Sequence, residues 1–312
     1  MINTNSLGIL GQFYFNIKES FKSIYQNSNF YEKKISKTFD NSFEYKPSPH
    51  LLSSIIKYQN KKYKIEDFAI ESIWQNNLSP KDYEKLNNFF WFFSLDLKSS
   101  KKTTQTVIKN WISNNSKYQK KSWEFDLTAK RIISWLSNHQ LTYEDSDQEY
   151  RSTFDHMIQK QTNHLLNEIK NSKEIENKMI GCAAIILTGL AYKNEKQYLL
   201  NGLNLLKNII KSSIDNQGFP KSRNIRQLIF YLKYFIIIRE WFKESQSLIP
   251  EYIDETIYYL GSSYAFIWQN TKQDIFFNGN FSSENKEFDQ YLKRFGYTFK
   301  NQINELGGYA IL

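Results

Sequence analysis

Residues 215–224 read Asp215-Asn216-Gln217-Gly218-Phe219-Pro220-Lys221-Ser222-Arg223-Asn224 and separate two strongly helical stretches. Gly218 and Pro220 end the first stretch, because glycine and proline interrupt a helical pattern. Ser222 is a favourable N-cap for the second stretch, which continues through the apolar residues 228–232. Two long helices joined by a short polar turn predict an antiparallel helical hairpin.

The same turn carries cationic and amide groups. Lys221 and Arg223 lie near the start of the second helix, where free backbone N–H groups and the helix dipole favour negative charge. The turn is therefore a candidate anion site. The alternative is an ordinary connection between helices with a solvated Lys and Arg.

The composition extends the helical prediction to the whole chain. Among 312 residues there are 24 Phe, 21 Tyr and 7 Trp, but only 11 Gly and 5 Pro, too few for a β-sandwich or barrel rich in tight turns. Such a length allows one large domain or two ordinary ones. The net charge of +9 suggests an anionic partner. No dense basic block is present, so nucleic acid is not the expected partner, and RNA binding is a weaker alternative.

The helical pattern predicts three regions. Residues 1–79 form an N-terminal extension of short elements, among them a helix at 9–25 and a hairpin at 55–65. Residues 80–272 form the helical domain, and residues 273–312 a connection and the first strand of a truncated β domain. Within the helical domain, helices are expected at 80–93, 102–113, 123–139, 147–170, 174–192, 196–213, 222–243 and 250–270. A strand at 274–280 and a short helix at 287–295 follow, and a strand begins near Gly307.

Neither a cofactor nor a metal is expected. The single cysteine, Cys182, lies in the apolar run 179–187 and is interpreted as a core residue. The four histidines are His50, His139, His156 and His164. They lack metal-ligand spacing, and His139 is the preferred candidate if a catalytic histidine is needed.

The order of several landmarks resembles the N-terminal helical domain of the heparinase II/III-like polysaccharide lyase family. The matching segments are 89–97, 111–112, 123–136, 183–190, 215–224, 277–279 and 307–309. The resemblance covers roughly residues 80 to 312. It implies an all-α, incomplete (α/α) toroid of antiparallel helical hairpins with a short β segment at the C-terminal end. In the family a β domain follows the toroid, and the active site lies between them.

The reaction that the resemblance implies is β-elimination on an acidic, uronate-containing polysaccharide. A base removes the proton next to the carboxylate and an acid protonates the leaving oxygen, while other groups stabilise the developing charge. The resemblance assigns carboxylate neutralisation to Asn177 and acid/base chemistry to Tyr231. The expected substrate-binding residues are Arg131, Trp135, Lys221, Arg223 and Asn224.

The chain departs from the family pattern at three positions. Lys178 follows Asn177 where the family has His, and Gln269 or Asn270 stands where many relatives have another His. The family's Tyr position falls near Ile225, with Tyr231 later on the same helix. The alternative function is therefore a non-catalytic helical scaffold that binds an anionic glycan or a protein partner.

The sequence also bears on location. Residues 1–7 lack a basic region followed by an apolar core, so no signal peptide is expected. The cytoplasm is the expected compartment, with the periplasm as the alternative. No apolar stretch reaches the ~20 residues of a membrane span.

Overall fold

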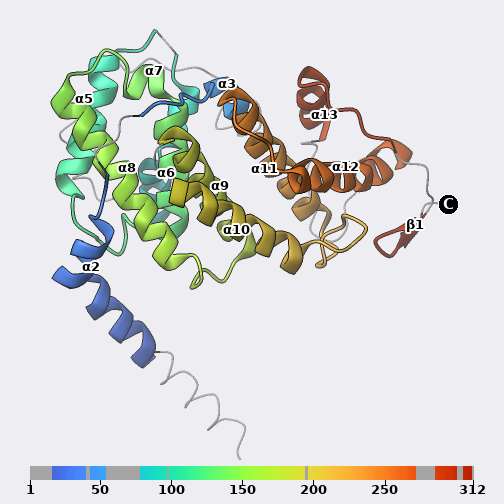
Figure 1. Ribbon diagram of the computed structural model, residues 1–312, viewed down its shortest axis with the longest axis horizontal. Helices are drawn as coiled ribbons and strands as arrows, with labels where there is room; N and C mark the ends of the chain where they lie inside the picture. Colours follow the sequence, from blue (N-terminus) through green and yellow to red (C-terminus); the bar gives the residue numbers. More distant parts are fainter. Residues whose placement is uncertain are drawn as a thin grey trace, which may run out of the picture.

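The computed structural model describes residues 16–39, 43–53, 78–96, 98–193, 196–271, 285–300 and 305–310. This part of the chain is almost entirely helical (Figure 1), as the composition predicts. After a helix at 16–26 come α2 (Asn29–Ile35), α3 (Pro49–Ser53), α4 (Pro80–Asn88), the 3₁₀ helix η2 (Phe90–Ser94), α5 (Lys101–Asn114), α6 (Phe125–Ser137), α7 (His139–Thr142), α8 (Gln148–Glu168), α9 (Ile175–Ala191), α10 (Lys196–Ser213), α11 (Ile225–Glu244), α12 (Glu251–Thr271) and α13 (Asn285–Arg294). The strands β1 (Glu305–Leu306) and β2 (Tyr309–Ala310) pair antiparallel.

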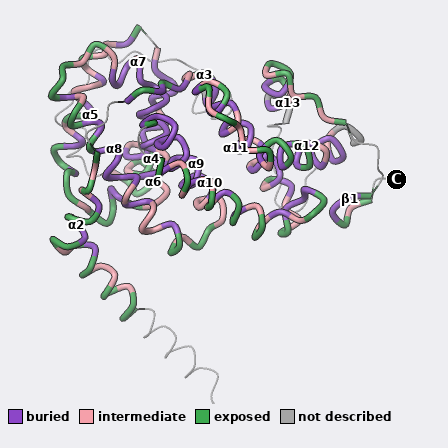
Figure 2. Tube along the Cα trace, viewed as in Figure 1, coloured by how far each residue is buried: buried purple, intermediate pink, exposed green. Residues whose placement is uncertain are grey.

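Helix α9 is the centre of the fold. It packs against α6, α8, α10 and α11, and every residue from Met179 to Ala191 is buried (Figure 2). A helix that is apolar on all sides is stable only when neighbouring helices cover it on all sides. The surrounding antiparallel helices form the incomplete (α/α) toroid that was expected.

Two glycines let α9 and α10 approach closely. A Cβ atom on Gly189 would lie 2.4 Å from the backbone nitrogen of Leu199, and one on Gly202 would lie 2.6 Å from Cγ1 of Ile186. Cys182, buried as expected, donates its S–H group to the carbonyl oxygen of Gly202 at 3.2 Å. These contacts pair the end of α9 with the start of α10, so the two helices are antiparallel.

Two helix ends differ from the sequence prediction. The helix from Pro80 ends at Asn88, because Phe89 adopts a left-handed conformation with φ 58° and the Asn88 side chain accepts the N–H of Phe90 at 2.9 Å. Helix α11 begins at Ile225 and not at residue 222, because Asn224 is its N-cap and accepts the N–H of Arg226 at 2.9 Å.

The ends of the chain confirm part of the prediction. The helix at 16–26 agrees with the described part of the expected helix 9–25, and α13 agrees with the expected helix 287–295. The expected hairpin at 55–65 and strand at 274–280 lie outside the described residues, and the division into three regions stays a prediction. The prediction that a strand begins near Gly307 is wrong in detail. Gly307 and Gly308, with φ of 62° and 82°, form the tight turn of the hairpin β1–β2.

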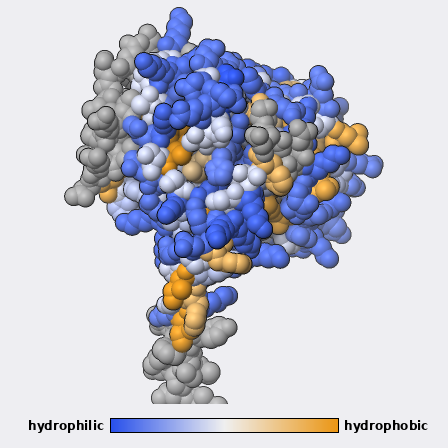
Figure 3. Space-filling view, turned by 60° about the vertical axis from the view of Figure 1, so that its left-hand side comes forward, coloured by the Kyte–Doolittle hydropathy of each residue, from blue (hydrophilic) through white to orange (hydrophobic). Residues whose placement is uncertain are grey.

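The first described helix projects from the body and carries apolar side chains on its surface. Phe21 and Ile24 are 69% and 68% exposed, and the projecting part is orange in Figure 3. No helix among the described residues is both long and apolar enough to cross a membrane.

A buried carboxylate ties several segments together. Tyr143 and Tyr192 donate their hydroxyl groups to the two oxygens of Asp155, at 2.9 and 2.7 Å. The ring of Phe43 contacts both tyrosine rings. Burial raises the pKa of Asp155 to about 6, although both tyrosine hydroxyl groups act in the opposite direction.

We expect the variant Gly189→Ala to unfold more easily, because the new methyl group would meet backbone atoms that cannot rotate away. Overpacking of this kind costs about 1–3 kcal/mol of unfolding free energy. Urea unfolding measures the loss. Gly296→Ala is the control: nothing lies within 4 Å of its Cβ position, so only the strain of its φ of 76° applies, about 1 kcal/mol. Equal stability of Gly189→Ala and the parent would contradict the close packing.

We expect Asp155 to make stability depend on pH. Its pKa is higher in the folded chain than the ordinary 3.8, so its contribution is complete below about pH 4 and is lost as the pH rises through about 6. Between pH 4 and pH 8 the parent should lose on the order of 2 kcal/mol more unfolding free energy than Asp155→Asn. Parallel pH profiles for the two proteins would show that Asp155 does not titrate in this way.

Candidate functional site

The amino ends of α9 and α11 and the carboxyl end of α10 lie at the same end of the toroid. Because α10 is antiparallel to α9, Ser213, at the end of α10, lies near the start of α9. Helix α11 runs parallel to α9: Glu176 is close enough to raise the pKa of Tyr231, and Lys193 donates to the carbonyl oxygen of Ser245 at 3.2 Å. The arrangement brings five predicted residues to this end: Asn177, Lys221, Arg223, Asn224 and Tyr231.

The turn between α10 and α11 is organised around Asp215. One carboxylate oxygen accepts the N–H groups of Gln217 and Phe219, at 3.0 and 2.9 Å, and the other pairs with the guanidinium of Arg223. Burial raises the pKa of Asp215, but Arg223 and the two N–H groups outweigh burial and hold the pKa below its usual value. Arg223 has a left-handed φ of 59°. The turn thus has one defined conformation.

The hairpin β1–β2 covers this turn. The N–H of Gly307 donates to the Gln217 side chain at 3.2 Å, and the hydroxyl of Tyr309 donates to the carbonyl oxygen of Arg223 at 2.8 Å. A Cβ atom on Gly307 would lie 2.6 Å from the ring of Phe219, which is fully buried. The hairpin therefore holds the turn in place.

The cations of the turn remain accessible. The Arg223 side chain is 43% exposed although it pairs with Asp215, and Lys221 is exposed and donates to the carbonyl oxygen of Lys211 at 2.7 Å. Arg223 precedes the N-cap Asn224, so it lies two residues further from the helix than expected with Ser222 as the N-cap. Two cationic side chains on a fixed turn can bind a carboxylate or sulfate group.

The two predicted catalytic residues differ in exposure. Asn177 is partly buried and donates to the carboxylate of Glu174 at 3.1 Å. Tyr231 is fully buried, and its hydroxyl has no hydrogen-bond partner among the described residues. Burial raises the pKa of Tyr231, and the nearby Ser213 side chain offsets part of this increase. At neutral pH its phenol is therefore protonated and could donate a proton but not accept one.

The expectation that Arg131 and Trp135 contact substrate is not supported, because both side chains are fully buried. Arg131 donates to the Gln161 side chain and to the carbonyl oxygens of Asn87 and Ser122, at 2.7, 2.9 and 3.0 Å, and its guanidinium lies 3.9 Å from the centre of the Trp111 ring. Burial lowers the pKa of Arg131 to about 9. Arg131 and Trp135 are therefore core residues of α6, in the region where α4, α5, α6 and α8 pack together.

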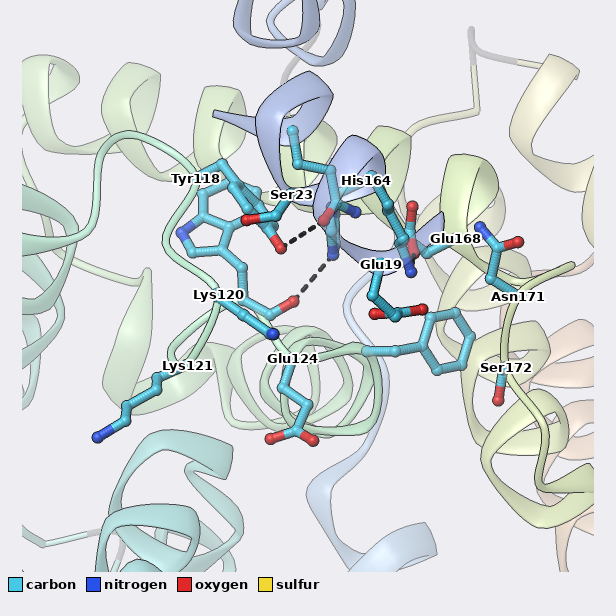
Figure 4. Close-up of a pocket in the computed structure, with 14 residues that line it drawn as sticks. Glu19, Ser23, Tyr118, Lys120, Lys121, Glu124, His164, Glu168, Asn171 and Ser172 are labelled. Atoms are coloured by element: carbon cyan, nitrogen blue, oxygen red, sulfur yellow. Dashed lines mark hydrogen bonds and ion pairs between the residues drawn. The ribbon is translucent and has the colours of Figure 1, made fainter. Parts of the chain in front are cut away.

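A second feature, a pocket of about 530 Å³, was not predicted (Figure 4). It lies among the helix 16–26, the loop before α6, the end of α8 and the loop before α9. Its lining residues are Glu19, Lys22, Ser23, Gln26, Tyr118, Lys120, Lys121, Trp123, Glu124, Phe125, His164, Glu168, Asn171 and Ser172. They come from four separate segments, so no single stretch of sequence could have indicated the pocket.

The histidines in the helical body have structural partners. His164, which lines the pocket, is hydrogen-bonded to the Tyr31 hydroxyl and to the carbonyl oxygen of Trp123, at 2.7 and 2.8 Å. Burial lowers the pKa of His164 to about 3, so it is neutral. His139 is paired with Glu144 at 3.0 Å, and His156 with Thr38 at 2.7 Å. The described residues contain no cluster of three or more metal-ligating side chains.

The fold is similar to that of two solved polysaccharide lyases. Heparan sulfate lyase HepC from Pedobacter heparinus matches with a TM-score of 0.53 and 11% sequence identity, over 85% of this chain and 46% of that protein. Heparinase III matches with a TM-score of 0.52 and 13% identity, over 95% of this chain and 52% of that protein. The chain spans about half the length of these structures. The similarity establishes a heparinase-like helical fold.

Comparison by sequence adds no relative. No family model matches the chain, and no curated protein matches it.

We expect Asp215→Ala to release the turn, because the change removes the acceptor of two backbone N–H groups and the partner of Arg223. Hydrogen exchange at the Gln217 and Phe219 amides should accelerate about tenfold or more, since the lost bonds are each worth about 1 kcal/mol or more. Lys221→Ala is the control, because its side chain bonds only the carbonyl oxygen of Lys211, at the end of α10, and neither of the two amides. Unchanged exchange in Asp215→Ala would contradict the central role of Asp215.

Proposed function

We propose that this protein is a polysaccharide-lyase-like enzyme that acts on an acidic, uronate-containing polysaccharide at the end of the toroid that holds Asn177 and the 214–224 turn. The proposal is supported most by one observation: on a fold shared with two heparan sulfate lyases, the first turn of α9, with Asn177, lies at the same end of the helical body as the segment 221–231.

The residues at this end have distinct roles in the proposal. Lys221 and Arg223 bind acidic groups along the polymer, since charge-assisted hydrogen bonds to carboxylate or sulfate are the stronger kind. The Asn177 amide donates to the carboxylate of the sugar that reacts, once the amide leaves Glu174. Tyr231, protonated at neutral pH, donates to the leaving oxygen, and a separate base takes the proton next to the sugar carboxylate, since a protonated phenol cannot accept it. Asn224 fixes the start of α11 and so positions Arg223.

A second candidate function is non-catalytic binding of the same class of polymer. The observation in its favour is the complete burial of Tyr231, which leaves its hydroxyl without a path to a bound sugar unless α11 or its neighbours move. Lys178 also stands where the family has His. In this case Lys221 and Arg223 keep their roles, and no bond in the polymer is broken.

Incubation with heparan sulfate, chondroitin sulfate and alginate, followed by the absorbance of unsaturated uronate, tests the catalytic proposal. We expect product from at least one polymer. Asn177→Ala and Tyr231→Phe should each lower kcat/KM by about 100-fold or more, the usual effect of removing a charge-stabilising or proton-transfer group. No product from any polymer would reject catalysis.

Binding of heparan sulfate oligosaccharides separates the two candidates. Arg223→Ala should weaken binding about tenfold, equivalent to 1.4 kcal/mol, in both cases. The control is Lys33→Ala, which removes one charge from an exposed position on α2. Binding that depends on Arg223 without turnover supports the scaffold, and binding that is equal in the two variants would reject both candidates.

A further inference from the structure

The pocket beside the helix 16–26 has the size and lining of a ligand site. Ligand pockets are commonly about 300–1,000 Å³ and combine aromatic walls with a few polar groups, and this one is about 530 Å³. Figure 4 shows Lys120 and Lys121 on one side of it, Asn171 and Ser172 on the opposite side, and Glu19 between them.

Two half-buried aromatic side chains, Tyr118 and Phe125, line the pocket, whereas Trp123 and His164 are only 1% and 2% exposed. Trp123 donates its indole N–H to the carbonyl oxygen of Asn115 at 3.1 Å, and both nitrogens of His164 are bonded within the protein. The Tyr118 hydroxyl donates to Gln26 at 2.8 Å. Because the Tyr118 hydroxyl is already bonded and Phe125 has no polar atom, these two side chains can present only their rings to a ligand. A sugar suits such a surface, since its C–H faces pack on aromatic rings.

The rim of the pocket is balanced in charge. Three cations, Lys22, Lys120 and Lys121, face three carboxylates, Glu19, Glu124 and Glu168. Lys22 and Glu168 neutralise each other at 2.5 Å. A strongly anionic group would therefore meet carboxylates as well as lysines. An uncharged sugar, or one with both an amino and an acidic group, can bond to both.

The pocket extends to the loop that leads into α9. Asn171 and Ser172 line the pocket and lie in the loop that leads into α9, where Asn177 is in the first turn. Phe125, another lining residue, packs so closely on α9 that a Cβ atom on Gly181 would lie 2.3 Å from its ring. One polymer chain could therefore follow the loop from Asn177 to the pocket.

We propose that this pocket is a second saccharide subsite, which binds an amino-sugar unit of the same polysaccharide several units from the one at Asn177. The proposal rests on the proposed function, because it takes the polymer as the ligand. The rings of Tyr118 and Phe125 pack on the sugar ring, Glu19 or Glu124 accepts from the amino group, and Lys120 or Lys121 pairs with an attached acidic group.

Calorimetric titration of the full chain with a heparan sulfate disaccharide and octasaccharide tests the subsite. Only the longer ligand can occupy both places, so the parent should bind the octasaccharide about tenfold or more tightly than the disaccharide. Ser23→Phe, which fills the pocket from the helix 16–26, should abolish this gain and leave disaccharide binding unchanged. Ser20→Phe is the matched control, because Ser20 is exposed on the same helix and does not line the pocket.

Asn171→Trp fills the same pocket from the opposite side and should have the same effect as Ser23→Phe. Agreement between the two variants shows that the effect does not come from misfolding of one of them. If both variants keep the octasaccharide gain, the pocket is not a subsite, while the proposed function stands. If the parent binds neither ligand, the proposed function and the subsite are both rejected.

Discussion

The close approach of α9 and α10 is the constraint on which the rest of the structure depends. Gly189 and Gly202 have no side chain to separate the helices, so the backbone of each touches the other. Because α9 is buried on all sides, its position fixes α6, α8 and α11 around it. The same contact returns the end of α10 to the start of α9. The polar groups at this end of the toroid therefore gather as a consequence of apolar packing.

Polar contacts then give this end its local shape. The Asp215 carboxylate accepts hydrogen bonds from within its own turn, and Tyr309 and Gly307 of the hairpin β1–β2 donate hydrogen bonds to the same turn. Arg223 adopts a left-handed backbone conformation that is uncommon for a residue with a side chain, and the surrounding bonds compensate for its strain. A cation on so rigid a turn loses little conformational freedom when it binds an anion, which favours affinity.

The sequence predicts the helices well because apolar periodicity and turn residues are local signals. It predicts α10 at 196–213, as observed. It misses the break at Phe89, which depends on distant partners of the preceding turn: Trp111 and Arg131 both bond to Asn87. The resemblance assigns Arg131 and Trp135 to substrate binding, but packing against distant helices buries both side chains. The pocket is formed by four segments that are separate in the sequence, so no local sequence pattern could predict it.

The central claim is that an acidic polysaccharide binds where the amino ends of α9 and α11 meet the 214–224 turn. Hydrogen exchange followed by mass spectrometry, with and without a saturating heparan sulfate oligosaccharide, tests it most directly. The account predicts slower exchange in peptides that cover residues 174–178 and 215–226, and unchanged exchange in α5. Protection confined to other helices, with the turn unaffected, would contradict it.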